Sequence, residues 1–266
     1  PDDAGLLSDL GMVLADTMRY DEAMECFRRA RELAPRSVDA IQRQALLLDH
    51  LGERAGGEEL LGKALELAPQ DDHVHYNIGL FHLKYGEFAQ GWEGYERRRN
   101  FESFVGRHRR FPLPEWDGTP LEERTLLVLP EQGLGDEIMF GSCIPDIARR
   151  AAHVIVECDV KLEAIFRRSF PQCTVVSRQR TLANDWVTRI EPRPDVQIAA
   201  GSLARYFRRS LADFPMFADM NGSALARLQS LIEAADYGAG STILSAGQAH
   251  DDRAFFIVAC ASAPPT

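Results

Sequence analysis

The sequence lacks the features that mark membrane, nucleic-acid-binding or disulfide-rich proteins. No apolar run approaches the roughly 20 residues that span a bilayer, so we expect no membrane span. The net charge of −10 gives no general positive field to attract phosphates, which argues against a nucleic-acid partner. The five cysteines are scattered and never form C-x-x-C, which fits a reducing compartment better than a disulfide framework or a zinc site. We therefore predict a cytoplasmic protein with no metal and no other cofactor.

Two further absences concern the ends and the size of the chain. It opens with Pro1-Asp2-Asp3 rather than with a charged and then apolar leader, and it has no initiator methionine. We therefore expect no signal peptide in this stretch, and we expect the sequence to be a fragment. A length of 266 residues, 45% of them apolar, suits one large soluble domain or two ordinary ones.

A phrase recurs in the first hundred residues. It reads RRARELAP in the first copy and GKALELAP in the second, and the two copies end 34 residues apart. Small residues recur with the same period at Gly11, Ala45 and Gly79. Small residues at such positions let paired helices approach closely, while large apolar residues fill the layers between repeats. The period and the small-residue positions resemble the tetratricopeptide repeat. This resemblance predicts three helix pairs over residues 4–103.

The first helix of each tetratricopeptide repeat lines the ligand groove of that family. The resemblance therefore implies an unidentified protein partner bound through these helices. The alternative is that the repeats are a packing scaffold with an unspecified partner. Basic residues that clamp a peptide carboxylate in some members are missing, which argues against a chaperone-tail adaptor. The groove positions in this sequence are Ser8, Met12, Gln42, Leu46, Tyr76 and Leu80.

Residues 104–124 contain three prolines and predict a linker. The bulky Phe111 and Trp116 are expected to pin it against one of the domains. A basic cluster at this junction either binds an anionic ligand or pairs with acidic neighbours at a solvated helix end, and we favour the pairing. The members of the cluster are Arg97, Arg98, Arg99, Arg107, Arg109 and Arg110.

Residues 125–214 alternate short apolar runs with helical patterns. Such alternation predicts βαβ units and a parallel sheet covered by helices on both faces. The fold class is thus α plus α/β, with helical repeats followed by a partial Rossmann-like domain. The expected strands are 125–130, 153–157, 173–177 and 196–199, and the expected helices are 136–151, 160–169 and 202–212.

A glycine turn, EQGLGDEIMFG, follows the first expected strand. Gly133 and Gly135 match two glycines of the dinucleotide fingerprint G-x-G-x-x-G, and Glu157 could contact a ribose, but Ile138 replaces the third glycine. Asp136 also occupies the positive helix end that a pyrophosphate would use. A P-loop is excluded because no Gly-Lys-Ser/Thr follows. A second interpretation is that Asp136 merely caps its helix.

A third interpretation comes from resemblance. The turn belongs to the segment TLLVLPEQGLGDEIMFGSCIP, which FPLPEWDG precedes and GSLARYFRRS follows. This combination resembles bacterial proteins that join tetratricopeptide repeats to a GT-B glycosyltransferase-like domain. The pattern is similar to the N-terminal half of ADP-heptose–lipopolysaccharide heptosyltransferases. The resemblance implies a sugar acceptor and a nucleotide sugar as partners, with Asp136 as general base for the acceptor hydroxyl. No D-x-D triplet occurs in the chain, in agreement with metal-independent transfer.

The glycine turn also suggests substrate-binding positions. Gly133 and Gly135 would let a substrate approach the backbone without meeting a Cβ. Glu131 and Gln132 are expected beside the pocket, at the carboxyl end of the first strand, where α/β sheets bind their ligands.

The resemblance does not extend over the tail, residues 215–266. A GT-B enzyme needs a second Rossmann-like domain, typically about 100 to 150 residues, for the nucleotide sugar. The tail has one expected helix, 223–235, and one apolar run, 254–261, and truncation or a frameshift would explain it. We predict a glycosyltransferase-like protein, inactive alone, that becomes a hexosyl- or heptosyltransferase only if a donor domain is supplied. The alternative is a non-catalytic tetratricopeptide scaffold that mediates protein–protein interaction.

Overall fold

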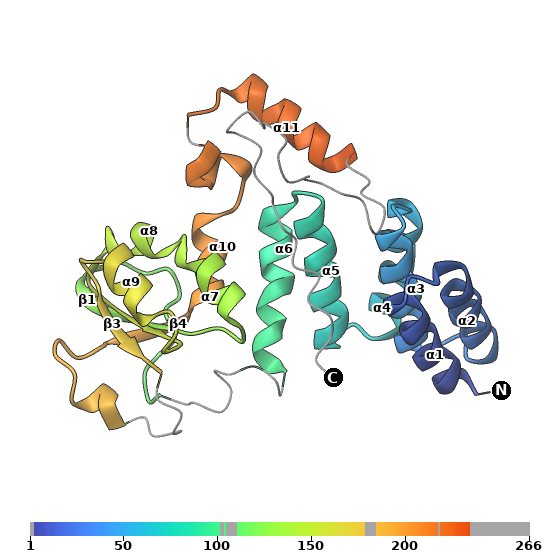
Figure 1. The fold of residues 1–266 in the computed structure, drawn as a ribbon, viewed down its shortest axis with the longest axis horizontal. Coiled ribbons are helices and arrows are strands. Elements are labelled where there is room, and N and C mark those ends of the chain that lie inside the picture. The colour runs from blue at the N-terminus through green and yellow to red at the C-terminus, as the bar shows by residue number, and fades with distance from the viewer. Residues whose placement is uncertain (1–2, 102–103, 105–110, 179–184, 218, 235–266) are drawn as a thin grey trace. The chain divides into compact units, whose positions relative to one another are not determined.

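The computed structural model describes residues 3–101, 104, 111–178, 185–217 and 219–234. The chain divides into two compact units (Figure 1). One is built on the residues up to Tyr95 together with the segment from Gly222, and the other on Glu96–Asn221.

The first unit contains six helices up to Tyr95, arranged as three pairs of sequence neighbours. Each pair is a helical hairpin with a short turn (Figure 1). The helical repeats predicted from the 34-residue period are therefore present. The helices are α1 (Ala4–Asp16), α2 (Tyr20–Leu33), α3 (Val38–His50), α4 (Arg54–Leu67), α5 (Asp72–Lys84) and α6 (Phe88–Tyr95).

The first helix of each pair begins at a polar cap, and the caps recur with the repeat. Asp3, Ser37 and Asp71 precede α1, α3 and α5, and each side chain accepts a hydrogen bond from a backbone N–H of the first helical turn. Such a bond satisfies a donor that the helix itself leaves unpaired. The residues that cap the first helix of each pair therefore recur with the same 34-residue period as the repeat.

Close approach of paired helices depends on glycine, as the sequence predicts. A Cβ on Gly79 would lie 2.7 Å from a backbone atom of Gly94, and one on Gly11 would lie 2.5 Å from the Phe27 ring. In the third pair, Gly79 faces Gly94 of the partner helix, and the nearest neighbour of Gly91 is Leu83.

Polar contacts join successive repeats at about one repeat's spacing. Asn77 Nδ2 of α5 donates to Gln42 Oε1 of α3 at 2.7 Å. Lys84 Nζ donates to Asp49 Oδ1 at 2.9 Å in the same pair of helices. These contacts hold the first helices of neighbouring repeats in register.

The second unit is built on a four-stranded, all-parallel sheet of order β3-β2-β1-β4. In the central strand β1, the run 126–129 is buried, as expected when helices cover both faces of the sheet. β1 begins four residues before the predicted start at Thr125, within the segment expected to be linker. The strands are β1 (Leu121–Leu129), β2 (Ala151–Cys158), β3 (Thr174–Ser177) and β4 (Val196–Ala199).

The helices of this unit are shorter than predicted. The single helix expected over 136–151 is two helices, α7 (Leu134–Gly141) and α8 (Ile144–Ala148), and the chain then enters β2. Pro145 explains the break, because it has no N–H to donate to the carbonyl of Gly141. The other short elements are α9 (Glu163–Ser169), α10 (Ala204–Phe207) and the 3-10 helices at 96–100, 185–188, 200–203, 211–213 and 215–217.

The bulky residues of the expected linker belong to the core of the second unit. Phe111 is 4% exposed and packs with Leu127 and Ile155 of the sheet. Trp116 is 5% exposed, and its backbone N–H donates to the Gln197 carbonyl of β4 at 2.8 Å. The prediction that both residues pin the linker to a domain is confirmed.

After the second unit, α11 (Gly222–Ala234) agrees with the predicted helix at 223–235 within a residue at each end. The apolar run at 254–261 lies outside the described residues. Within the part of the chain that the structure describes, no helix is long and apolar enough to cross a membrane.

Candidate active site

The site lies at the carboxyl ends of β1 and β4, where the order of the sheet changes direction. From β1 the chain moves outward to β2 and β3, and it then returns to place β4 on the other side of β1. Open parallel sheets bind ligands at such a switch point. The turn after β1, residues 130–133, and the 3-10 helix after β4, Ala200–Leu203, meet there.

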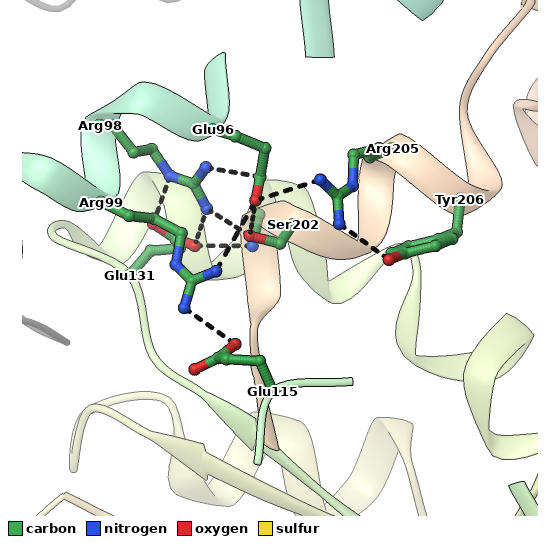
Figure 2. Close-up of polar contacts among 9 residues, drawn as sticks. Glu96, Arg98, Arg99, Glu115, Glu131, Ser202, Arg205 and Tyr206 are labelled. Carbon is green, nitrogen blue, oxygen red and sulfur yellow. Dashed lines mark hydrogen bonds and ion pairs between the residues drawn. The ribbon is translucent and has the colours of Figure 1, made fainter. Parts of the chain in front are cut away.

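A buried ion pair connects these segments. Arg98 is 1% exposed and Glu131 is 0% exposed. Arg98 donates from Nη2 to Glu131 Oε1 at 2.7 Å and from Nε to Oε2 at 3.2 Å (Figure 2). The backbone N–H of Gly201 donates to the same Oε1 at 2.7 Å. The two-pronged arrangement matches the planar guanidinium to the carboxylate and satisfies both buried charges.

Gly201 is required by this packing. A Cβ at this position would lie 2.7 Å from Arg98 Nη2 and 2.8 Å from Glu131 Oε1. Only glycine brings the backbone N–H close enough to donate to the carboxylate while the guanidinium occupies the same space.

The substrate-binding role expected of Glu131 stays a prediction, and in the structure its carboxylate is bound by Arg98 and Gly201. Arg98 and Gly201 occupy both of its oxygens, so contact with a substrate would require the ion pair to break. The sequence located Glu131 at the end of the strand, but it did not show that a buried counter-charge comes from the 3-10 helix 96–100.

Glu96 is the centre of the rest of this network (Figure 2). Its Oε2 accepts a hydrogen bond from Ser202 Oγ at 2.9 Å, and its Oε1 lies 3.1 Å from Arg98 Nη1. The same carboxylate lies 3.9 Å from Arg99 and 4.0 Å from Arg205. Ser202, like Gly201, was not predicted; both lie in the quoted segment GSLARYFRRS, whose small residues follow a strand.

The predicted pairing of the basic cluster with acidic neighbours is confirmed for Arg98 and Arg99. Arg98 is buried, however, and not at a solvated helix end. Arg99 Nη2 contacts Glu115 Oε2 at 2.8 Å, and burial raises the pKa of that carboxyl group. Arg107, Arg109 and Arg110 lie outside the described residues. In the network the charges balance between Glu96, Glu115, Glu131 and Arg98, Arg99, Arg205, so it offers no net positive charge to an anion.

Asp136 is the third residue of α7, one turn beyond the end of β1. Its Oδ2 accepts a hydrogen bond from the backbone N–H of Gly133 at 3.2 Å, the side-chain-to-backbone half of a capping box. Asp136 thus stabilises its helix start from the N3 position and is not itself the N-cap. Burial, and then the nearby Glu131 carboxylate, raise the pKa of Asp136 above its ordinary value.

The other predicted positions lie on the outer side of the same turn. Gln132 and Gly135 are exposed, and Gly133 is half-buried. A Cβ on Gly135 would meet nothing within 4 Å. The structure therefore brings Gln132, Gly133, Gly135 and Asp136 together at an exposed turn. Whether these residues bind substrate stays a prediction.

Glu137 is a buried acid that no sequence pattern indicated. It is 3% exposed, and its Oε2 accepts from the Asp159 backbone N–H at 2.8 Å, which ties α7 to the turn after β2. Burial raises the pKa of Glu137 to about 7. The sequence predicts that Glu137 follows Asp136 in the helix, but it does not predict the burial of Glu137, because that depends on how α7 packs.

The predicted groove positions of the repeats differ in their exposure. Met12, Tyr76 and Leu80 are half-buried, and Leu46 is 38% exposed. Gln42 is 8% exposed, and its amide oxygen accepts a hydrogen bond from Asn77 Nδ2, so a role for it in the groove stays a prediction. Its polar group serves contact between repeats. Ser8 is fully buried as well.

Among the described residues, no group of three or more His, Cys, Asp or Glu side chains could hold a metal ion.

The elements define a class of protein: helical repeats of tetratricopeptide type followed by a small parallel α/β unit. No protein-family model matches the chain. Protein FlbA of Caulobacter vibrioides is 25% identical over 263 residues, a match that covers 81% of this chain and 44% of FlbA. The chain thus spans less than half the length of this relative.

Two solved structures illustrate the similarity. MamA from Desulfovibrio magneticus is 21% identical, with 41% of this chain and 62% of that chain covered at a TM-score of 0.33. A mutant O-GlcNAc transferase from Thermobaculum terrenum is 16% identical, with 80% of this chain and 49% of that chain covered at a TM-score of 0.35. Because these TM-scores are low, the fold rests on the chain's own elements.

Proposed function

We propose that this chain carries the sugar-acceptor half of a GT-B-type glycosyltransferase, with Asp136 as the general base. One observation supports the proposal above the others. A half-buried carboxylate with a raised pKa lies at an exposed glycine turn, at the switch point of a parallel sheet. A raised pKa makes a carboxylate a stronger base, and the position is one where α/β sheets bind ligands.

The chemistry requires one proton transfer from the acceptor. Asp136 Oδ2 accepts the hydrogen bond from the Gly133 N–H, so in this proposal the other oxygen, Oδ1, takes the proton. The acceptor hydroxyl gives its proton to Oδ1 as its oxygen bonds to the anomeric carbon of the donor sugar. The bond from that carbon to the nucleotide diphosphate breaks, and its electron pair leaves with the phosphate. A separate donor-binding domain would hold the nucleotide sugar.

The ion pair of Arg98 and Glu131 has a positioning role in this proposal. Glu131 precedes the glycine turn and is fixed by Arg98 and Gly201, so the backbone leading to Asp136 is held at both ends of the turn. A base must lie within hydrogen-bond reach of the proton that it takes, and a fixed turn maintains that reach.

The same geometry disfavours a dinucleotide site. In that class the N–H groups at the helix start donate to a pyrophosphate. Here the N–H of Gly133 donates to Asp136, and the carboxylate would repel a second anion.

Gly135 provides the test. Because a Cβ there meets nothing within 4 Å, Gly135→Val should fold normally. If the acceptor approaches this turn, the added side chain should raise the KM for the acceptor in a chain extended by a donor-binding domain. The matched control is Gly62→Val on α4, where a Cβ also meets nothing within 4 Å. If Gly135→Val leaves the KM for the acceptor unchanged, the acceptor does not bind at this turn.

A second candidate function, protein binding by the repeats, is favoured by a separate observation. Met12, Leu46 and Leu80 occupy one repeat position at 34-residue spacing, and Leu46 is 38% exposed. They form an apolar line across the first helices, suited to a peptide or protein segment. A photo-crosslinking residue at position 46 should capture a partner, whereas one at the exposed position 33 on α2 should not. Equal capture at both positions would contradict this function.

A further inference from the structure

The first helix exposes a row of large apolar side chains. Leu6 is 59% exposed, Leu10 45% and Val13 60%. Their spacing of four and three residues places them on one face of α1. Single exposed leucines are ordinary on protein surfaces, but a continuous apolar face indicates a contact surface.

The equivalent positions of the second repeat are in contact with the preceding helix. The residue one period after Leu6 is Ala40, which is 0% exposed and packs against Ala30 of α2. The residue one period after Val13 is Leu47, which is 4% exposed and packs against Phe27 of α2. This face of α3 is therefore the surface that receives the second helix of the repeat before it.

The equivalent position of Leu10 follows the same rule. It is occupied by Gln44 in α3, which accepts a hydrogen bond from Arg31 of α2 at 2.7 Å. In α5 the position is Ile78, which packs against the cluster that contains Leu61 and Ala64 of α4.

The third repeat gives a second, independent instance. Two periods after Leu6 and Val13 lie Val74, 0% exposed, and Phe81, 4% exposed. Both pack in the cluster that includes Leu61 and Ala64 of α4. The face that is exposed in α1 is thus buried in both later repeats, each time by the second helix of the preceding hairpin.

We propose that the face of α1 formed by Leu6, Leu10 and Val13 is the docking surface for a further helical hairpin of this repeat type. Its second helix would pack on α1 as α2 packs on α3 and as α4 packs on α5. The occupant is defined by the interfaces already present, and the inference is independent of the proposed function.

The chemistry of the occupant follows from α2 and α4. Both present small residues beside a large apolar one, Ala30 with Phe27 and Ala64 with Leu61. Small residues let the helices approach closely, and the large one fills the gap between repeats. A second copy of α1 would instead oppose two rows of large side chains, which is a poorer match.

The test joins a copy of residues 37–70 directly in front of Asp3, in place of residues 1–2. The junction then repeats the native sequence order, because the copy is followed by the cap Asp3 as residue 70 is followed by the cap Asp71. Amide hydrogen exchange is measured in α1 with and without the copy. We expect exchange in α1 to slow on the order of tenfold in the extended chain, as burial raises local stability.

Two variants make the result specific. Leu10→Arg should cancel most of the slowing in the extended chain and change little in the original one. Leu33→Arg, at a leucine of α2 that is 47% exposed, should leave the slowing intact. Unchanged α1 exchange in the extended chain, or equal effects of the two substitutions, would overturn the proposal. So would self-association of the original chain in sedimentation that Leu10→Arg abolishes, because the face would then belong to a second copy.

Discussion

At the scale of single residues, Glu137 makes stability depend on pH. Its pKa of about 7 in the folded chain lies above the ordinary 4.5, so folding favours the protonated form. The stabilisation is fully present below pH about 4.5 and is lost as pH rises through about 7, by at most about 3 kcal/mol.

Glu137→Gln tests this directly. Glutamine stays neutral and can still accept the hydrogen bond from the Asp159 N–H. The variant should match the original chain near pH 4 and exceed it in unfolding free energy above pH 7, by up to about 3 kcal/mol. Urea unfolding at the two pH values measures the difference. A gain of equal size at both values would show that titration of Glu137 is not its cause.

The residue scale also shows what the sequence could and could not predict about the site. The position of Asp136 and its glycines between β1 and α7 could be predicted because strand, turn and helix are consecutive in the chain. The contacts of Glu131 were missed because they come from Arg98 and Gly201, which lie 33 and 70 residues away. Local pattern places a charged residue at a strand end, but only the packed fold determines which opposite charge it meets.

At the scale of elements, the turns between paired helices share a left-handed backbone position that is glycine in two repeats and methionine in the first. Gly52, with φ of 83°, and Gly86, with φ of 75°, adopt left-handed conformations, and the equivalent residue in the first repeat is Met18, with φ of 61°. Side chains other than glycine are strained in this conformation by about 1 kcal/mol.

Met18→Gly should therefore stabilise the helical unit by up to about 0.6 kcal/mol, because the lost strain of about 1 kcal/mol exceeds the added entropy of the unfolded chain, about 0.4 kcal/mol or more. Met18 is 66% exposed, so little packing is lost. The reciprocal Gly52→Ala should destabilise by a similar amount. Denaturant midpoints of the two variants measure both effects, and a shift in the same direction for both would contradict the account.

Element boundaries show where periodicity misleads. The apolar pattern of residues 136–151 predicted one helix, although Pro145 lies within it and divides it in the structure. The start of β1 at Leu121 was assigned to the linker, because the polar residues at 122–124 obscure the strand pattern at its exposed end. The strong 34-residue period and the buried apolar runs, by contrast, correctly predicted the helix pairs and the parallel sheet of the fold class.

At the scale of the whole molecule, the Arg98–Glu131 pair joins segments distant in sequence into one unit. Arg98→Met should leave the Glu131 carboxylate buried without its counter-charge and cost about 3 to 5 kcal/mol. The double variant Arg98→Met with Glu131→Gln should recover most of that loss, because the uncompensated charge is removed. Chemical unfolding of the single and double variants measures the coupling. Additive losses would show that the two residues do not act as a pair.

The central claim is that Asp136 is the base for the acceptor hydroxyl, and Asp136→Asn tests it most directly. Asparagine keeps an oxygen for the Gly133 N–H and removes only the proton acceptor. Glycosyl transfer is measured in a chain extended by a donor-binding domain, beside the unfolding free energy of the same variant. We predict that stability changes by less than about 1 kcal/mol, while kcat falls by a factor on the order of 100 or more. Turnover equal to that of the unsubstituted protein would contradict the claim and leave Asp136 as a helix-stabilising residue alone.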